Sequence, residues 1–166
     1  MQSKLYKKFG REDKVLQNHA RILYKIGQVS KADGFVGELL AKNLNDRDTK
    51  RVELAFKRST LNAKEYVDAL NAYLEANWDD AQVWLELADV YEKKLNFDKA
   101  IYCFEELLLL DPKDFSLYQK LAELHFTVGK LDNLKIAKKY LCLLLNINGL
   151  ALRPLWALLH TCRVLV

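Results

Sequence analysis

Residues with a fixed spacing between positions 81 and 112 constrain the fold more than any other feature of the sequence. The first group follows the spacing i, i+3, i+4 and i+7, which places side chains on one face of an α-helix, and consists of Trp84, Leu87, Ala88 and Tyr91. A second helical stripe consists of Ala100, Ile101, Phe104, Leu107 and Leu108. Pro112 closes the segment, because proline cannot continue a helix. The small side chains of Ala88 and Ala100 would let two antiparallel helices approach closely.

The same arrangement recurs along the chain. Ala100 has counterparts at Ala32, Tyr66 and Ala137, separated by steps of 34, 34 and 37 residues. The spacing and the period resemble the tetratricopeptide repeat, whose pattern is W-x2-L-G-x2-Y, then A-x3-F, then P, with Ala88 here in place of the glycine. The resemblance predicts an all-α protein, a right-handed superhelix (α-α solenoid) of about four helix pairs.

We expect a single domain over residues 1–166, with repeat units at approximately 13–46, 47–80, 81–114 and 115–151. The second unit departs most from the pattern, because Tyr66 stands where a small residue is expected. The fourth unit contains three extra residues, which we expect to lengthen its inter-helix turn within Asp132–Lys135. Gly27 and Gly129 occupy the same place between two helices, where a left-handed residue is useful.

Both ends of the chain are predicted to hold partial repeats. Ser3–Phe9 resembles the end of a second helix, and Leu152–Val166 resembles a first helix. Repeat arrays need polar capping helices at their ends, and the apolar residues of the last segment have none. This segment indicates a fragment, a partner that covers the end, or self-association through uncapped ends.

The composition favours a folded protein without a membrane span. Hydrophobic residues make up 51% of the chain and charged residues 29%. The best candidate for a span, Gly149–Val166, is too short and too charged to cross a bilayer. We find no secretory signal pattern, and the three cysteines form no C-x-x-C pair, which favours reduced thiols in a cytosolic or nuclear protein.

The best candidate for a partner-binding surface is a basic cluster in the second unit. Lys50 and Lys57 are seven residues apart, and so are Arg51 and Arg58, so each pair falls on nearly one face of a helix. Residues 1–60 hold 14 of the 26 basic side chains and 7 of the 22 acidic ones. The cluster would meet acidic segments of a partner or phospholipid head groups, or it is an ordinary solvated helix face.

No catalytic residue, metal site or cofactor motif is predicted. His19 and His125 occupy core positions and fit packed histidines better than a base or a metal ligand. His160 and Cys162 are two residues apart on one expected helix, which places them on different faces. The glycine-rich nucleotide-binding motifs are absent. The sequence therefore predicts a non-enzymatic protein without a cofactor.

A co-chaperone adaptor that binds peptide tails of other proteins is the alternative function. Some tetratricopeptide domains clamp a terminal carboxylate with Lys and Asn on the inner face of their first helices. These inner positions hold Leu85 and Asp89 in the third unit and Gln119 and Glu123 in the fourth, and acidic groups would repel a carboxylate. The first unit offers only Gln17 and Arg21. Nucleic-acid binding is not expected, because aromatic residues such as Trp84 sit at core positions rather than on a surface.

Residues 70–145 resemble one family in more detail. The stretches Tyr73–Leu74, Asp80–Tyr91 and Phe97–Leu107 are similar to the second subunit of the endoplasmic reticulum membrane protein complex. The insertion Asn133–Leu134, which generic tetratricopeptide repeats lack, is a further similarity. The resemblance extends from about Leu5 to about Leu159.

This resemblance implies a function that the spacing alone does not. Members of that family are scaffold subunits of an insertase that places transmembrane helices into the bilayer. They bind the other subunits of the complex and lie in the cytoplasm, peripheral on the cytosolic face of the endoplasmic reticulum membrane. The partners expected from the resemblance are therefore those subunits, with the basic cluster and the Leu85–Asp89 face as candidate contacts.

Overall fold

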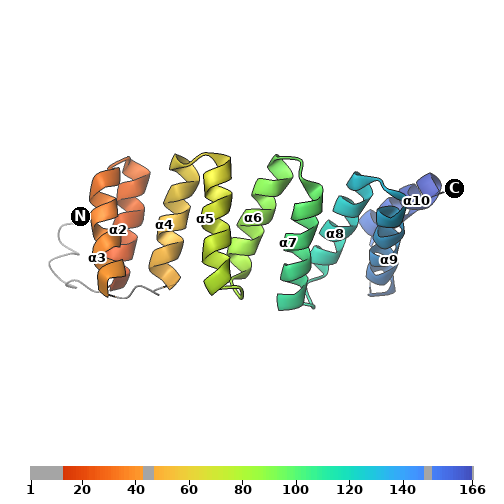
Figure 1. Ribbon diagram of the computed structural model, residues 1–166. Coiled ribbons are helices and arrows are strands. Elements are labelled where there is room, and N and C mark those ends of the chain that lie inside the picture. Colours follow the sequence, from red (N-terminus) through yellow and green to blue (C-terminus); the bar gives the residue numbers. More distant parts are fainter. Residues whose placement is uncertain (1–12, 43–46, 148–150, 166) are drawn as a thin grey trace. The chain divides into compact units, whose positions relative to one another are not determined.

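The structure is a computed structural model that describes residues 13–42, 47–147 and 151–165. The secondary structure in these ranges is α-helical and includes no strand, which confirms the predicted all-α class. The helix end predicted at Ser3–Phe9 lies outside the described residues. The chain divides into two compact units, Met1–Asn77 and Trp78–Val166, which are described separately (Figure 1).

Unit 1 contains the helices α2 (Asp13–Ile26), α3 (Val29–Lys42), α4 (Arg47–Thr60) and α5 (Ala63–Ala76). Helix α2 packs against α3 and α4, and α4 also packs against α5. The core between the first three helices is formed by Ala20, Val36 and Val52, all buried. Beside this core the ring of Tyr24 stacks on Phe56, with ring centroids 4.0 Å apart.

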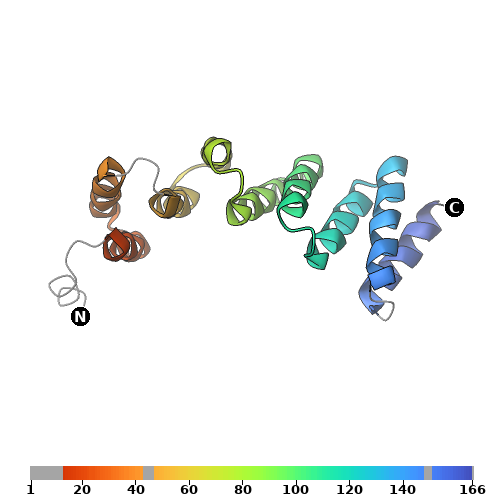
Figure 2. The ribbon, with the colours of Figure 1, turned by 90° about the horizontal axis from the view of Figure 1, so that it is seen from below.

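Unit 2 contains the helices α6 (Ala81–Lys93), α7 (Phe97–Leu110), α8 (Phe115–Val128), α9 (Leu131–Ile147) and α10 (Leu152–Leu165). Each helix packs against the next, from α6 to α10. The α6–α7 and α8–α9 turns lie at one end of the helices and the α7–α8 turn at the other, so successive helices are antiparallel (Figure 1). Helices α9 and α10 lie side by side in a second view as well (Figure 2).

The residues of the repeat pattern form the core of the α6–α7 pair. Ala88 and Ala100 are fully buried, and the larger residues of the pattern are at most 9% exposed: Trp84, Leu87, Tyr91 and Phe104. The indole nitrogen of Trp84 donates a hydrogen bond of 2.7 Å to the carbonyl of Trp78, so its polar atom is satisfied. Pro112 is exposed, directly after α7 has ended, and its carbonyl accepts a hydrogen bond from the hydroxyl of Tyr118.

Short polar side chains cap the starts of the helices α6, α7 and α8. The carboxylate of Asp80 accepts a hydrogen bond from the backbone N–H of Val83, and that of Asp114 accepts one from Ser116. Asn96 caps α7 in the same way through the N–H of Lys99. Each cap satisfies a backbone donor that the first turn of a helix leaves without a partner.

The predicted lengthening of the fourth unit's turn is wrong. Helix α9 begins at Leu131, and only two residues separate it from the end of α8. Asp132–Lys135 therefore lie within the helix. Helix α9 has 17 residues, whereas α7 has 14. Three residues are close to one helical turn, so they extend α9 at its start without rotating Ala137 away from the core. Leu134, in the predicted insertion, is 4% exposed and packs in the core.

In the pairs α2–α3, α6–α7 and α8–α9, the turn after the first helix has left-handed backbone at a recurring position. Gly27 and Gly129 have φ angles of 85° and 72° there, and Leu95, 34 residues before Gly129, has a φ of 56°. The N–H of Leu95 donates to the carbonyl of Glu92 and the N–H of Asn96 to that of Tyr91, which is the hydrogen-bond pattern of a Schellman helix end. Glycine suits this position because it has no Cβ; a leucine there is strained by about 1–2 kcal/mol.

Replacing Leu95 by glycine should therefore stabilise the protein. We expect Leu95→Gly to raise the free energy of unfolding by about 1 kcal/mol, because it removes the left-handed strain while the exposed side chain contributes little packing. Chemical denaturation monitored by circular dichroism measures this. The matched reverse variant, Gly129→Leu, should lower the free energy of unfolding; equal stabilities for all three proteins would contradict the strain at Leu95.

Candidate partner-binding surfaces

Helices α8, α9 and α10 create a groove in unit 2. Ala122 of α8 packs with Leu141 and Leu144 of α9, and Ala157 and Leu158 of α10 lie against this cluster. The small side chains of Ala122 and Ala157 leave space between α8 and α10, and a pocket of about 440 Å³ lies there. We call this pocket and its lining the α8–α10 groove.

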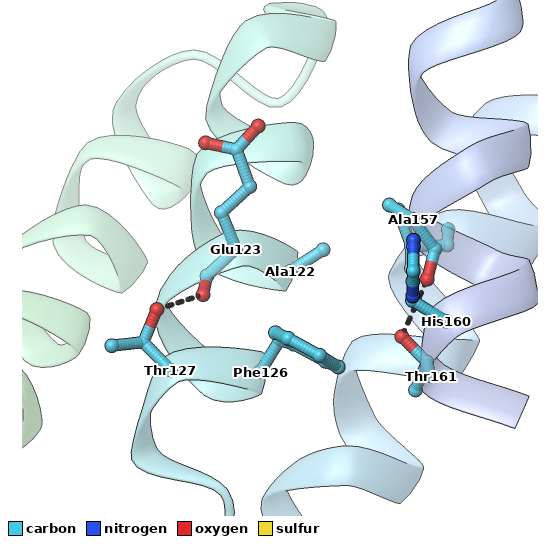
Figure 3. A pocket seen from close by; sticks show the side chains of 8 residues that line it. Ala122, Glu123, Phe126, Thr127, Ala157, His160 and Thr161 are labelled. Carbon is cyan, nitrogen blue, oxygen red and sulfur yellow. Dashed lines mark hydrogen bonds between the residues drawn. The ribbon is translucent and has the colours of Figure 1, made fainter. Parts of the chain in front are cut away.

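The lining of the α8–α10 groove is mainly apolar. The groove is lined by residues of all three helices: Ala122, Glu123, Phe126, Thr127, Leu141, Ala157, His160 and Thr161. Phe126 projects from α8 toward α10, where His160 lies (Figure 3). Phe126 is 37% exposed although it is a large apolar residue, so the groove presents an aromatic surface to a binding partner.

The threonines of the groove bond to their own helices. The hydroxyl of Thr127 donates to the carbonyl of Glu123, and that of Thr161 donates to the carbonyl of Ala157, both at 2.8 Å (Figure 3). Such bonds to the carbonyl four residues earlier satisfy the hydroxyl within its own helix. The groove is therefore suited to apolar side chains more than to a polar small molecule.

An ion pair bridges α8 and α10 beside the groove. The guanidinium of Arg153 lies 2.9 Å from a carboxylate oxygen of Glu123, which also accepts a hydrogen bond of 3.0 Å from the side chain of Gln119. Arg153 also lines a second pocket, of about 450 Å³, whose apolar residues include Phe115 and Ile147. The ion pair thus joins residues that line two adjoining apolar pockets, the arrangement expected for a surface that receives successive apolar side chains of a peptide segment.

The sequence placed Glu123 on the inner face of the fourth unit but did not predict this groove. The residues that form it, among them Phe126, Ala157 and His160, come from helices that belong to two different repeats. The available signal was the exposed apolar character of the last helix, on which Leu155, Trp156 and Leu159 are between 41% and 63% exposed. That signal indicated an uncovered surface but not where on it a pocket lies.

The predicted basic cluster lies on α4 of unit 1. Lys50, Arg51 and Lys57 are half-buried and Arg58 is exposed. The ammonium of Lys57 lies 2.7 Å from a carboxylate oxygen of Glu53, one turn earlier, so part of its charge is neutralised within the helix. The structure places the four residues on one helix, and their role in binding stays a prediction.

The second predicted contact lies on α6, in unit 2. Leu85 is 46% exposed. Asp89 is exposed, and the ammonium of Lys93 lies 2.6 Å from its carboxylate. In unit 1 the side chain of Gln17 is buried and donates a hydrogen bond of 3.1 Å to Thr49, so Gln17 is not placed to clamp a terminal carboxylate.

Packing positions two of the histidines and one of the cysteines. His125 is 5% exposed and lies 6.0 Å from Tyr140 between ring centroids, while His19 lies 5.0 Å from Phe35. Burial, with the nearby Glu106 as a lesser cause, raises the pKa of Cys103 to about 12, so this thiol is protonated and unreactive at neutral pH. Within the described ranges, no group of three or more His, Cys, Asp or Glu side chains is arranged to hold a metal ion.

Among the described helices, none combines the length and the hydrophobicity needed to cross a membrane. This finding applies to α10 as well, which contains most of Gly149–Val166, the stretch of the sequence that came nearest to a membrane span.

Comparison with known proteins gives consistent results. The family model of the EMC2 TPR-like repeat domain matches residues 14–131. ER membrane protein complex subunit 2-B of Xenopus laevis is 36% identical over 110 residues, which are 66% of this chain and 37% of the relative. ER membrane protein complex subunit 2 of Dictyostelium discoideum is 31% identical over 146 residues, which are 87% of this chain and 45% of the relative. The chain thus spans less than half the length of these relatives.

Solved structures agree on the fold. A tetratricopeptide repeat protein from Parabacteroides merdae superposes with a TM-score of 0.65 at 14% identity, over 89% of this chain and 58% of that one. Together with the repeat pattern and the helix pairs, this confirms the predicted tetratricopeptide fold class.

The buried imidazole of His125 makes stability depend on pH. Burial lowers the pKa of His125 below its ordinary value of 6.5, while Glu105, Asn133 and Asp98 act in the opposite direction. The unfolded chain therefore binds a proton more readily than the folded protein, so stability is lost as the pH falls from about 6.5 through the folded pKa. We expect melting temperatures to fall over this range, and His125→Phe to weaken the dependence.

The matched control for this prediction is His160→Phe. His160 is exposed on α10, so its replacement should leave the pH dependence of melting as it is in the unaltered chain. A His125→Phe protein that loses as much stability on acidification as the unaltered chain would contradict the role of His125.

Proposed function

The chain belongs to the EMC2 TPR-like repeat family, and on this premise we propose that it is a non-enzymatic scaffold subunit of the endoplasmic reticulum membrane protein complex. In this role it binds other subunits of the complex and so supports the insertion of transmembrane proteins. It lies peripherally, on the cytosolic face of the membrane.

The family match supports the proposal over most of the described helices, since it begins in α2 and ends at the start of α9. Relatives named as subunits of this complex are 31% to 36% identical. Because the chain covers less than half of their length, its partners and its contribution to insertion belong to the proposal rather than to the family match.

The α8–α10 groove is the observation that carries the proposed mechanism. Its apolar lining and its internally bonded threonines favour a protein segment over a polar metabolite. A helical or extended segment of another subunit would place apolar side chains against Phe126 and Ala157, with the Arg153–Glu123 pair as a polar contact at the edge. Binding of this kind depends on the shape and apolar character of the groove and requires no catalytic residue.

The basic cluster on α4 and the Leu85–Asp89 face of α6 are proposed as secondary contacts. Lys50, Arg51, Lys57 and Arg58 would meet acidic segments of a neighbouring subunit, with Glu53 already neutralising part of the charge of Lys57. Such contacts at the rim of an interface influence the association rate more than the affinity.

A co-chaperone adaptor is less well supported. Its clamp would need a cationic and an amide side chain free on the inner face, whereas Gln17 is buried against Thr49 and Asp89 is acidic. Recovery of a chaperone alone from cells would nevertheless favour this alternative.

Affinity purification from detergent-solubilised cells tests the proposal. We expect the tagged chain to recover several membrane subunits of the complex in stoichiometric amounts. Phe126→Glu should reduce this recovery by about tenfold or more, because it places a charge in an apolar interface at a position that is already partly exposed in the fold. Reversing the four basic residues of α4 to Glu should reduce recovery less strongly.

Leu109→Glu is the matched control, since Leu109 is 75% exposed on α7 and outside the groove. It should recover the complex as well as the unaltered chain does. If the Phe126→Glu protein has a normal melting temperature and still recovers the membrane subunits normally, the groove is not where the partner binds. The absence of any membrane subunit from the unaltered chain's partners would contradict the scaffold function itself.

A further inference from the structure

Two turns at the same end of unit 2 expose leucine beside lysine. The α6–α7 turn carries Lys94 and Leu95, and the α8–α9 turn carries Lys130 followed by Leu131 at the start of α9. Lys94, Leu95 and Lys130 line one shallow pocket, so the two turns are neighbours in space (Figure 1). We call these four residues the lysine–leucine edge.

The leucines of this edge have little packing role within unit 2. Leu95 is 74% exposed and Leu131 is 59% exposed. Leu95 also occupies the left-handed position where Gly129 stands in the next repeat, so the chain tolerates strain to keep a bulky apolar side chain there. A strained residue whose side chain faces solvent indicates a contact with something outside the fold.

The charges at the two ends of unit 2 differ in sign. The segments 93–99 and 128–135, at the lysine–leucine edge, contain five lysines and two aspartates. The segments 78–80 and 111–114, at the opposite end, contain four aspartates and one lysine. Some lysines of these two segments are engaged locally, since Lys93 pairs with Asp89 and Lys135 lies 3.6 Å from Asp132, but lysines still outnumber aspartates there by three.

We propose that the lysine–leucine edge of unit 2 docks on an anionic phospholipid surface. Leu95 and Leu131 enter the boundary between head groups and acyl chains, and Lys94 and Lys130 contact the head-group phosphates and carboxylates. Turns that combine apolar tips with flanking lysines suit this environment, because the apolar side chains leave water while the ammonium groups remain at the surface. The opposite end is acidic and would be repelled, so the charge difference orients the unit.

The inference goes beyond the proposed scaffold function and does not depend on it. Binding to subunits is tested in detergent, where no bilayer is present, and lipid binding is tested with the purified chain, where no other subunit is present. The proposed subunit binding and the proposed lipid docking can therefore fail independently of each other.

Flotation with vesicles tests the docking. We expect the purified chain to float with vesicles of equal parts phosphatidylcholine and phosphatidylserine and to remain in solution with pure phosphatidylcholine. The double variant Leu95→Gly with Leu131→Ser, and separately Lys94→Glu with Lys130→Glu, should each reduce the bound fraction by roughly fivefold or more. We expect this first variant to fold, because glycine relieves the strain at position 95 and the side chain of Leu131 is exposed.

Lys113→Glu, in the acidic α7–α8 turn, is the matched charge control and should bind as the unaltered chain does. Failure of the unaltered chain to float with anionic vesicles would overturn the proposal. So would equal flotation of the edge variants, which would assign lipid attraction to another surface such as α4. Loss of co-purifying subunits in these variants, with vesicle binding unaffected, would show that the edge contacts protein instead.

Discussion

The close packing of one helix against its neighbour at small side chains is the constraint on which unit 2 depends. Ala88 and Ala100 are fully buried between α6 and α7, and the equivalent residues of the next repeat, Ala122 and Ala137, are no more than 1% exposed. A methyl group at each position lets the two backbones approach, and a larger side chain would force them apart. The same small residue has a second consequence, since Ala122 together with Ala157 leaves the space that becomes the α8–α10 groove. Packing within a repeat thus also shapes the surface between repeats.

Much of the fold could be predicted from the sequence, because the same pattern of core residues recurs in successive repeats. Trp84, Tyr91 and Phe104 are buried as their helical spacing predicts. The prediction failed at Asp132–Lys135, because three extra residues are equally compatible with a longer turn and with one more turn of helix, and α9 takes the second solution. The groove could not be predicted, because it depends on the contact of α8 with α10, which no local spacing encodes. The left-handed Leu95 was also missed, because only glycine signals that backbone in a sequence.

Several polar side chains of unit 2 make hydrogen bonds to their own backbone. Binding by this unit would therefore depend on the shape of its surface and on exposed apolar side chains. Asp80, Asn96 and Asp114 cap helices, and the threonines of the groove bond to their own backbone. His125 and Cys103 are held neutral by burial and do not resemble activated groups. Two surfaces of this unit differ in character, the apolar α8–α10 groove and the lysine–leucine edge. The proposed scaffold function would use the groove to hold a protein segment, and the proposed docking would use the edge at a lipid surface.

Site-specific photo-crosslinking from position 126 in intact cells tests the central claim most directly. A photoreactive amino acid replaces Phe126 in the groove, and the same amino acid at position 109, exposed on α7, serves as the reference. The account predicts that position 126 crosslinks to a subunit of the endoplasmic reticulum membrane complex and that position 109 does not. Crosslinks from position 126 to a chaperone alone, or equal products from both positions, would contradict the groove as the place where this chain holds its partner.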